Sequence, residues 1–441
     1  MMIRDPVHGD VLFTEQEKTI LDTAEIQRLR GIKQLGTAYL VYPGALHTRF
    51  DHSVGTMAVA KRIISTLRSK GQEISDEEEM IITASALAHD VSHVPFGHTF
   101  EDERKILPGH ERTERLNEHL ADSELSDSLD QLGILEETRC ILEAKEPLEK
   151  NHPEPWMPQI VKDAVSSDLL DYLRRDAYFT GLAQDYDDRL FHYFIIASLE
   201  NQPRSTRVLA VDLGKQGMVR QDARSEVMHL LRMRYFLTER VYYHHAKQAS
   251  GAMISKALEI CINHGFDPAD LARLNDWTLL EVLKGYDLST PIIRKLIEGV
   301  EARKLYKRAF VLGPEVGASR RNELISLYNR PGPEREELES MIVSKLGKDW
   351  SEAGPGDIIA HCPDLGTMKE ARVFARDEEG LVERLHRHRR SISRDLDVIE
   401  NQYAGIWRFF VFSKPRLART VGRVCKEFFQ EEGGYLAKSY D

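Results

Sequence analysis

Apolar residues recur at helical spacing through the first ninety residues of this chain. Segment 16–40 has this spacing, and segment 50–70 continues it with one apolar face. Ser75 followed three residues later by Glu78 is a capping-box pattern, and Pro95 cannot continue a helix. The pattern predicts two core-forming segments and a third helix that runs from Ser75 to Pro95.

Two later segments, 206–213 and 406–412, are rich in β-branched and aromatic residues and predict short strands. Gly-Pro breaks near 312–317 and 354–356 indicate where the chain divides. The expected fold is mainly α, with small β elements. We expect one domain over residues 1–314, which includes an acid-rich helical insertion at 101–160, and a C-terminal α+β lobe over 315–441, packed on the core and at subunit contacts.

Composition narrows the class of protein. The 441 residues include 41% hydrophobic residues and carry a formal net charge of −11, so an anionic ligand needs a local basic site. The four cysteines are widely spaced without a CxxC pair, which is typical of a reducing compartment. No apolar run approaches the roughly 18 residues that span a bilayer. We expect a cytoplasmic protein without a membrane anchor.

Candidate chemistry centres on the adjacent pair His89 and Asp90. His52 lies upstream and Asp168 downstream, so two imidazoles and two carboxylates occur in the order H…HD…D. Such a mixed N/O set suits one divalent metal ion, with Mg, Mn, Fe, Ni, Co and Zn all open. For any one of these histidines a core or surface role is the commoner meaning. The cluster as a whole, with three histidines within residues 89–98, favours a metal site.

A metal held by two histidines and two aspartates keeps coordination positions open for water and a phosphate oxygen. Phosphate-ester hydrolysis then also needs cations and a proton donor near the developing charge. The candidates are Arg49, Arg234, His93, His98 and His110. For each arginine alone, a surface ion pair is an equally good interpretation.

Five ordered blocks resemble the HD-domain deoxynucleoside triphosphate (dNTP) triphosphohydrolases. These blocks are residues 3–9, 27–36, 43–53, 86–98 and 168–176. The resemblance extends over about residues 1–310, and it includes vertebrate members that carry a sterile-alpha-motif domain and bacterial dGTPase-like members. It implies an HD-domain helical core and hydrolysis of a dNTP to deoxynucleoside and inorganic triphosphate.

Carried over position by position, the resemblance implies three sets of residues. The metal ligands are His52, His89, Asp90 and Asp168. The catalytic residues are His93, His98, His110 and Glu101, where Glu101 stands in place of an aspartate. The substrate-binding residues are Gln34 and Leu35 beside the sugar, Arg49 and Arg234 on the phosphates, Tyr172 and Asp176 on the deoxyribose, and Tyr242 against a 2′-hydroxyl. For the two tyrosines, ordinary helix packing is the alternative.

Two positions depart from the family pattern and bear on substrate. Leu169 stands where the vertebrate members have a phosphate-binding lysine, a contact worth roughly 1.5–3 kcal/mol. Arg174 or Arg175 is the candidate to compensate. Thr238 replaces a histidine near the base, so base preference stays open.

A second nucleotide site is implied by the same resemblance. Asp22, Gln27 and Arg30 match residues that bind a guanine activator between subunits, and Arg303 with Lys307 match residues that hold its phosphates. The resemblance therefore implies GTP or dGTP activation of a homo-dimer or homo-tetramer. Helix-surface ion pairs are the alternative for all five residues.

Three functional classes follow. The first is the dNTP triphosphohydrolase. The second is an HD-type phosphodiesterase or nuclease acting on nucleic acid or another nucleotide, for which the basic segment 384–390 would serve as a contact surface. The third is a nucleotide sensor without turnover, against which the complete ligand set argues.

Overall fold

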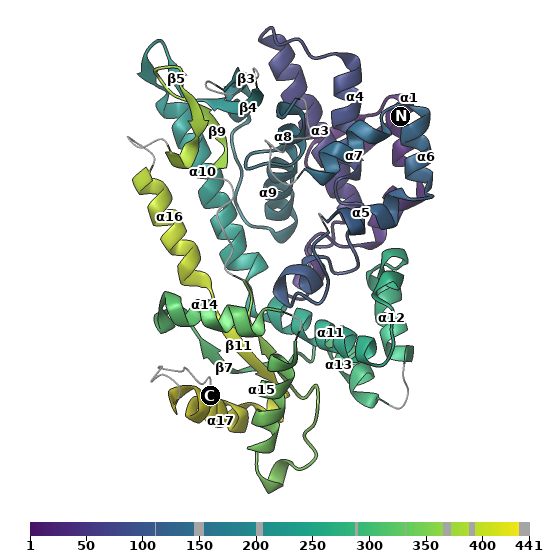
Figure 1. The fold of residues 1–441 in the computed structure, drawn as a ribbon, viewed down its shortest axis with the longest axis vertical. Helices are drawn as coiled ribbons and strands as arrows, with labels where there is room; N and C mark the ends of the chain where they lie inside the picture. The colour runs from purple at the N-terminus through teal and green to yellow at the C-terminus, as the bar shows by residue number, and fades with distance from the viewer. Residues whose placement is uncertain are drawn as a thin grey trace.

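A computed structural model describes residues 1–110, 112–144, 154–199, 206–286, 290–330, 332–364, 372–387 and 393–431. Helices make up most of these residues, and four small sheets accompany them (Figure 1). This confirms the mainly α prediction. Part of the basic segment 384–390 lies outside the described residues.

Three helices form the centre of the larger lobe. Helix α3 (Arg49–Ser69) packs against both α4 (Asp76–Ala88) and α9 (Ser167–Thr180). Side-chain caps begin each of them: Thr48 and Ser75 form capping boxes, and Ser166 accepts from a backbone amide of α9. These starts place residues 52 and 168 in the first turns of α3 and α9.

The third predicted helix ends earlier than the sequence indicated. Helix α4 stops at Ala88, not at Pro95, so residues 89 and 93 do not share a helix face. The carbonyl groups of residues 91–93 are bonded instead by two arginine side chains, Arg28 and Arg115, at 2.6 to 2.8 Å. Because these guanidinium groups satisfy the buried carbonyls, the chain can leave the helix without unpaired polar groups.

Segment 16–40 is also more broken than its spacing predicted. It forms α1 (Glu15–Leu21), α2 (Ala24–Arg28) and two 3₁₀ turns, Leu29–Gly31 and Gly36–Leu40. A short hairpin of β1 (Met2–Asp5) and β2 (Gly9–Leu12) precedes it.

Four helices follow α4 in the acid-rich region. They are α5 (Thr113–Leu120), α6 (Glu124–Gln131), α7 (Leu135–Glu143) and α8 (Trp156–Val161). Helices α7 and α8 pack against α4, and Leu125, Leu129 and Ile141 are fully buried in the same core as α3. These helices therefore belong to the main core of the lobe.

A second group of helices leads into the other lobe. It comprises α10 (Gln221–Leu237), α11 (His245–Asn263), α12 (Asp276–Tyr286) and α13 (Pro291–Glu301). Helix α11 packs against α13 and against the π-helical turn Thr99–Glu103. Figure 1 shows α11 where the two lobes meet.

The smaller lobe is built on an antiparallel sheet in the order β7–β11–β8, formed by Lys307–Leu312, Phe409–Ser413 and Ile358–His361. Helices α14 (Gly317–Tyr328), α15 (Pro333–Ser344) and α17 (Ala418–Glu431) accompany this sheet. The predicted strand at 406–412 is β11, although Ile406 still belongs to α16 (Ser393–Ile406). Strand β7 precedes residue 314, so the expected domain boundary divides this sheet.

A four-stranded sheet in the larger lobe also joins distant parts of the chain. Its order is β10–β9–β4–β3, formed by Val382–Arg384, Phe374–Arg376, Arg207–Asp212 and Phe194–Ser198. Strand β4 is the predicted strand at 206–213. A short pair, β5 (Gly214–Lys215) and β6 (Met218–Val219), follows it. Strand β9 pairs in parallel with β4, and α16 packs along α10, so residues beyond 370 return to the larger lobe.

Among the described residues, no helix is both long and apolar enough to cross a membrane.

Candidate active site

Three of the four predicted metal ligands, His52, His89 and Asp168, bring ligand atoms within 4.8 Å of one another, and Asp90 borders this group. His52 Nε2 lies 3.0 Å from Asp168 Oδ1 and 3.2 Å from His89 Nε2, and Asp90 Oδ1 lies 3.5 Å from His89 Nε2. Two ligands bound at about 2.1 Å and at right angles to one ion are themselves about 3 Å apart. The spacing and the donor types of His52, His89 and Asp168 therefore fit one divalent ion, with the Asp90 carboxylate next to it.

The two histidines present the correct nitrogen to such an ion. His52 Nδ1 lies 2.7 Å from Asp171 Oδ2, and His89 Nδ1 lies 2.8 Å from the carbonyl oxygen of Ala86. A carboxylate and a carbonyl can only accept, so each Nδ1 carries a proton, and each Nε2 is the nitrogen that faces the metal position.

Electrostatics favour a cation at this point. Burial disfavours the charged imidazolium of His52, but hydrogen bonds to Asp168 and Asp171 outweigh burial and raise its pKa to about 10. The pKa of Asp168 is lowered despite burial, because both histidines stabilise its carboxylate. The carboxylates thus draw positive charge into the position that a divalent ion would occupy.

A buried network behind His52 escaped the sequence interpretation. One oxygen of Asp171 lies 2.7 Å from His52 Nδ1, and the other lies 2.6 Å from His8 Nε2. Arg175 bonds both oxygens of Asp171 at 2.8 and 2.9 Å and also bonds Asp5 at 2.8 Å. Such a carboxylate fixes the orientation of a metal-binding histidine. Asp171 repeats the acidic character of Asp168 one helical turn later, which is the signal that could have found it.

Three further histidines stand beside the ligands. The rings of His93 and His110 stack at 3.7 Å between centroids, and His98 lies 5.0 Å from His93 and 5.4 Å from His110. His93 Nε2 is 3.3 Å from Asp90 Oδ1. The structure therefore brings the predicted catalytic histidines together and joins them to the ligand set.

Two neighbouring carboxylates serve different histidines in this group. Glu101 pairs with a histidine: its Oε2 lies 2.7 Å from His110 Nδ1. Asp102, which sequence reasoning missed, lies 2.7 Å from His98 Nδ1. Burial lowers the pKa of His98, but the hydrogen bond and charge of Asp102 outweigh it and the pKa is raised. The His98 side chain remains 49% exposed, which leaves it accessible to a ligand.

The residues predicted beside the sugar are linked through His47. Asp176 accepts from Tyr242 Oη at 2.6 Å on one oxygen and lies 2.9 Å from His47 Nε2 on the other. The backbone carbonyl of His47 accepts from the amide of Gln34 at 3.0 Å, and Leu35 beside it is buried. The Tyr172 ring lies 6.4 Å from the His52 ring. Asp176, Tyr242, Gln34 and Tyr172 thus lie in one region next to the ligands.

The predicted phosphate arginines differ in their present partners. Arg49 is buried and donates to Asp90 Oδ2 at 2.6 Å. Arg234 interacts electrostatically with Tyr172, Tyr242 and Asp168, which raises its pKa although burial opposes this. Both cations are therefore at the ligand cluster.

The prediction that Arg174 or Arg175 replaces the phosphate contact missing at Leu169 is wrong. Arg175 is fully buried in the Asp171 network, and Arg174 bonds Asp185 at 2.6 Å and Asp188 at 3.1 Å. Leu169 itself is buried in the main core. Neither arginine is placed to replace a phosphate-binding lysine.

The candidate activator residues do not meet within one chain. Arg30 donates to Gln27 Oε1 at 2.8 Å and stacks on Phe50. Arg303 donates to the carbonyl of Leu40, and Lys307 begins β7 in the smaller lobe, far from α1 (Figure 1). A shared site would need a second subunit.

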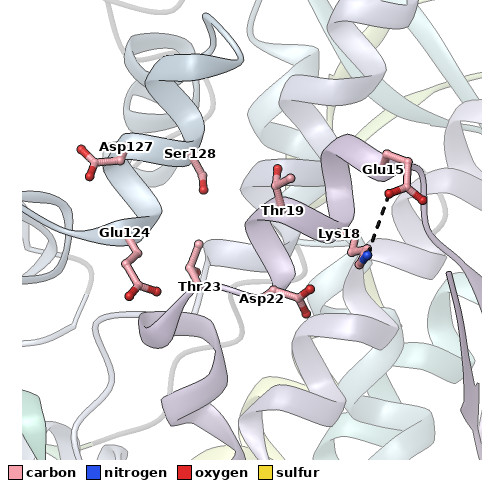
Figure 2. Close-up of a pocket in the computed structure, with 8 residues that line it drawn as sticks. All are labelled: Glu15, Lys18, Thr19, Asp22, Thr23, Glu124, Asp127 and Ser128. Atoms are coloured by element: carbon pink, nitrogen blue, oxygen red, sulfur yellow. Dashed lines mark ion pairs between the residues drawn. The ribbon is translucent and has the colours of Figure 1, made fainter.

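Asp22 lines an open hollow of about 470 Å³ between α1 and α6 (Figure 2). Its other lining residues are Glu15, Lys18, Thr19, Thr23, Glu124, Asp127 and Ser128. Four carboxylates and one lysine line the hollow, and Lys18 pairs with Glu15 at 3.9 Å. The hollow suits hydrogen-bond donors better than phosphate groups.

The helical core and its histidine and aspartate ligands define a metal-binding phosphohydrolase of the HD superfamily. The HD domain model matches residues 49–176, and the HD associated region model matches residues 219–433. The chain belongs to this family of HD-domain proteins with an HD-associated region.

Several relatives are similar over most of the chain. An uncharacterized protein of Methanocaldococcus jannaschii is 31% identical over 86% of this chain and 73% of its own length. The deoxynucleoside triphosphate triphosphohydrolase SAMHD1 of Bos taurus is 28% identical over 79% of this chain and 67% of its own length; for the Homo sapiens protein these values are 28%, 69% and 54%.

Solved structures share the fold. A phosphohydrolase from Bacteroides thetaiotaomicron superposes with a TM-score of 0.67 at 22% identity, and the match covers 94% of this chain and 99% of the other. At that identity the likeness concerns the fold alone.

Proposed function

We propose that this protein is a metal-dependent dNTP triphosphohydrolase, which converts a dNTP to a deoxynucleoside and inorganic triphosphate. The observation that carries the proposal is that three groups of residues lie together: the metal ligands, the histidine group and the residues assigned to the sugar. The histidine group touches the ligand set through His93 and Asp90, and Tyr172 lies against the ligand His52. The relatives named as dNTP triphosphohydrolases support the choice of substrate.

The reaction requires attack of water on the α-phosphorus and loss of the 5′-oxygen. A divalent ion bound by His52, His89, Asp90 and Asp168 would polarise a phosphoryl oxygen and lower the pKa of a bound water. His98, whose pKa is raised by Asp102, is the group suited to protonate the leaving 5′-oxygen.

Charge and shape would set the orientation of the substrate. Arg49 and Arg234 stabilise negative charge on the phosphates. Tyr242, held by its hydrogen bond to Asp176, would crowd a 2′-hydroxyl and so favour deoxyribose. His93, whose pKa is lowered chiefly by burial, stays neutral and can orient the attacking water.

The test is to incubate the metal-loaded protein with each dNTP, each NTP and single-stranded DNA, and to resolve the products. Triphosphate and deoxynucleoside from dNTPs alone support the proposal. Release of monophosphate with pyrophosphate, or cleavage of DNA, favours the phosphodiesterase or nuclease. No turnover of any substrate, with nucleotide still bound, favours a sensor.

Labelled water then locates the bond that breaks. In ¹⁸O-water, attack at phosphorus with loss of the 5′-oxygen places the label in triphosphate. Attack at carbon would place it in the deoxynucleoside. The first result is expected, because the metal ligands and arginines would contact phosphate oxygens.

The proposal includes activation by GTP or dGTP in a homo-dimer or homo-tetramer. Gln27 and Arg30 are already joined by a hydrogen bond, and Asp22 supplies an acceptor for guanine donors. Arg303 and Lys307 would come from another subunit.

A further inference from the structure

The loop that carries His98 and His110 is tied to the smaller lobe. This histidine loop, residues 98–110, begins with the π-helical turn Thr99–Glu103. Glu101 and Asp102 contact histidines of the loop, whereas the next two side chains bond to other helices. Glu103 accepts from Lys247 of α11 at 2.5 Å.

Arg104 makes the most extensive of these contacts. Its guanidinium is 1% exposed and donates to the carbonyl of Ala360 in β8 and to Glu259 Oε2 in α11, both at 2.7 Å. Its backbone carbonyl accepts from Arg335 Nη1 of α15 at 2.6 Å. One residue of the histidine loop is therefore held by three separate elements, two of them in the smaller lobe.

Arg335 completes the link because it also bonds the same glutamate. Glu259 stands between the two guanidinium groups, and Lys256 lies 3.7 Å away. The pKa of Glu259 is lowered although burial opposes this, chiefly by the charge of Arg104 and then of Arg335. Lys256 also bonds Glu339 of α15 at 2.7 Å, and Glu339 accepts from the Ala360 amide at 2.9 Å.

We propose that Arg335, acting through Arg104 and Glu259, is a positioning residue that fixes the histidine loop for hydrolysis. An ionic cluster this buried contributes little to stability relative to apolar packing, so its value lies in a defined geometry. A displacement of about 1 Å at a reacting group can cost about 100-fold in rate. The smaller lobe would thus complete the active site without touching the substrate.

Hydrogen exchange on the full-length protein tests the positioning role without relying on the proposed function. In Arg335→Lys, which keeps the charge but cannot bond Arg104 and Glu259 together, amide exchange in peptides covering 98–110 is expected to rise at least tenfold. The matched control is Lys105→Ala, which removes only an exposed ion pair from the same loop to Asp364, at 2.8 Å. Exchange in that control should stay near wild type.

Kinetics provide the second measurement, which rests on the proposed function. Arg335→Lys should lower kcat for dNTP hydrolysis tenfold or more, with KM within about twofold and metal content unchanged. Unchanged exchange at 98–110 in Arg335→Lys and in Arg335→Ala overturns the positioning role; if the alanine variant does not fold, the lysine variant alone decides. Absence of dNTP hydrolysis in the wild-type protein would refute the proposed function, and the exchange result would still stand.

Discussion

At the scale of single residues, the first prediction separates ligands from proton donors. His89→Ala and Asp168→Ala should each lose bound metal and activity together, because each removes a donor atom from a four-ligand set. His98→Ala should keep its metal and lose turnover. Elemental analysis of the purified variants checks this, and full metal occupancy in His89→Ala and Asp168→Ala would contradict the assigned ligands.

A second prediction concerns Asp171, which is not one of the assigned ligands but contacts the ligand His52. Asp171→Asn should weaken metal affinity about 10- to 100-fold, because the amide can no longer hold His52 and Arg175 as a carboxylate does. Metal titration followed by calorimetry measures the loss. Asp185→Asn is the matched control, since that aspartate pairs with Arg174 at the surface. Equal affinity in Asp171→Asn and the control would show that Asp171 has no part in metal binding.

The third prediction follows from the pair of His98 and Asp102. Burial lowers the pKa of His98, but Asp102 raises it above the ordinary value, so more of the acid form is present at neutral pH. Asp102→Asn should lower that pKa and move the alkaline limb of the kcat profile to lower pH. Activity should fall most at the upper end of the pH range and least at the lower end. An unshifted profile would exclude His98 as the proton donor.

At the scale of helices and strands, the helices with a local capping pattern could be predicted from the sequence. Helix α3 and the start of α4 follow from apolar spacing and from the Ser75 capping box, whose partners are neighbours in sequence. The early end of α4 depends on Arg28 and Arg115, which bond carbonyls 63 to 65 and 23 residues away. Local spacing carries no information on such contacts, so the predicted helix ran too far.

The candidate site divides in the same way. The H…HD…D ligands could be predicted because their residue types and order are themselves the chemical pattern. The contact of His8 with Asp171 spans 163 residues and fixes no local pattern, so no role could be assigned to His8. Asp102 was missed because two adjacent carboxylates stood near the histidines, and only the geometry assigns one to each.

Helix α5 offers a prediction about acid stability. His119 is 5% exposed, and burial, followed by the charges of Arg28 and Arg115, lowers its pKa to about 3. The unfolded chain binds this proton near pH 6.5. Its contribution to stability is therefore complete above about pH 6.5 and is lost as the pH falls toward 3.

His119→Gln should remove this dependence. The melting temperature of the variant should fall less steeply than that of wild type between pH 6.5 and 4.5, even if it is lower at pH 8. Scanning calorimetry at four pH values measures both slopes. Parallel slopes would mean that His119 takes up its proton over the same pH range in the folded and the unfolded protein.

At the scale of the whole molecule, the two lobes are interleaved in the described part of the chain. Strand β9 returns to pair with β4, α16 packs along α10, and Arg335 reaches the histidine loop. The HD-associated region, residues 219–433, therefore extends over both lobes, and its Arg335 contacts the histidine loop of the HD domain. The sequence break near 312–317 corresponds to the 3₁₀ turn Pro314–Val316, and it does not reveal that later residues pair again with the larger lobe.

The last prediction concerns assembly. The guanine-side candidates lie near α1 and α2, while Lys307 lies in the smaller lobe, so a nucleotide that touches both sets must bridge two subunits. A ligand that binds only the assembled state shifts the population toward it by mass action. GTP or dGTP should then stimulate hydrolysis of dATP, dCTP and dTTP and increase the sedimenting mass. Arg30→Ala should abolish both effects with metal content unchanged, since Arg30 contacts Gln27 and not the ligand set.

Equal rates with and without guanine nucleotide, together with an unchanged mass, would leave Asp22, Gln27 and Arg30 as surface residues of a constitutive enzyme, consistent with the acidic hollow beside α1.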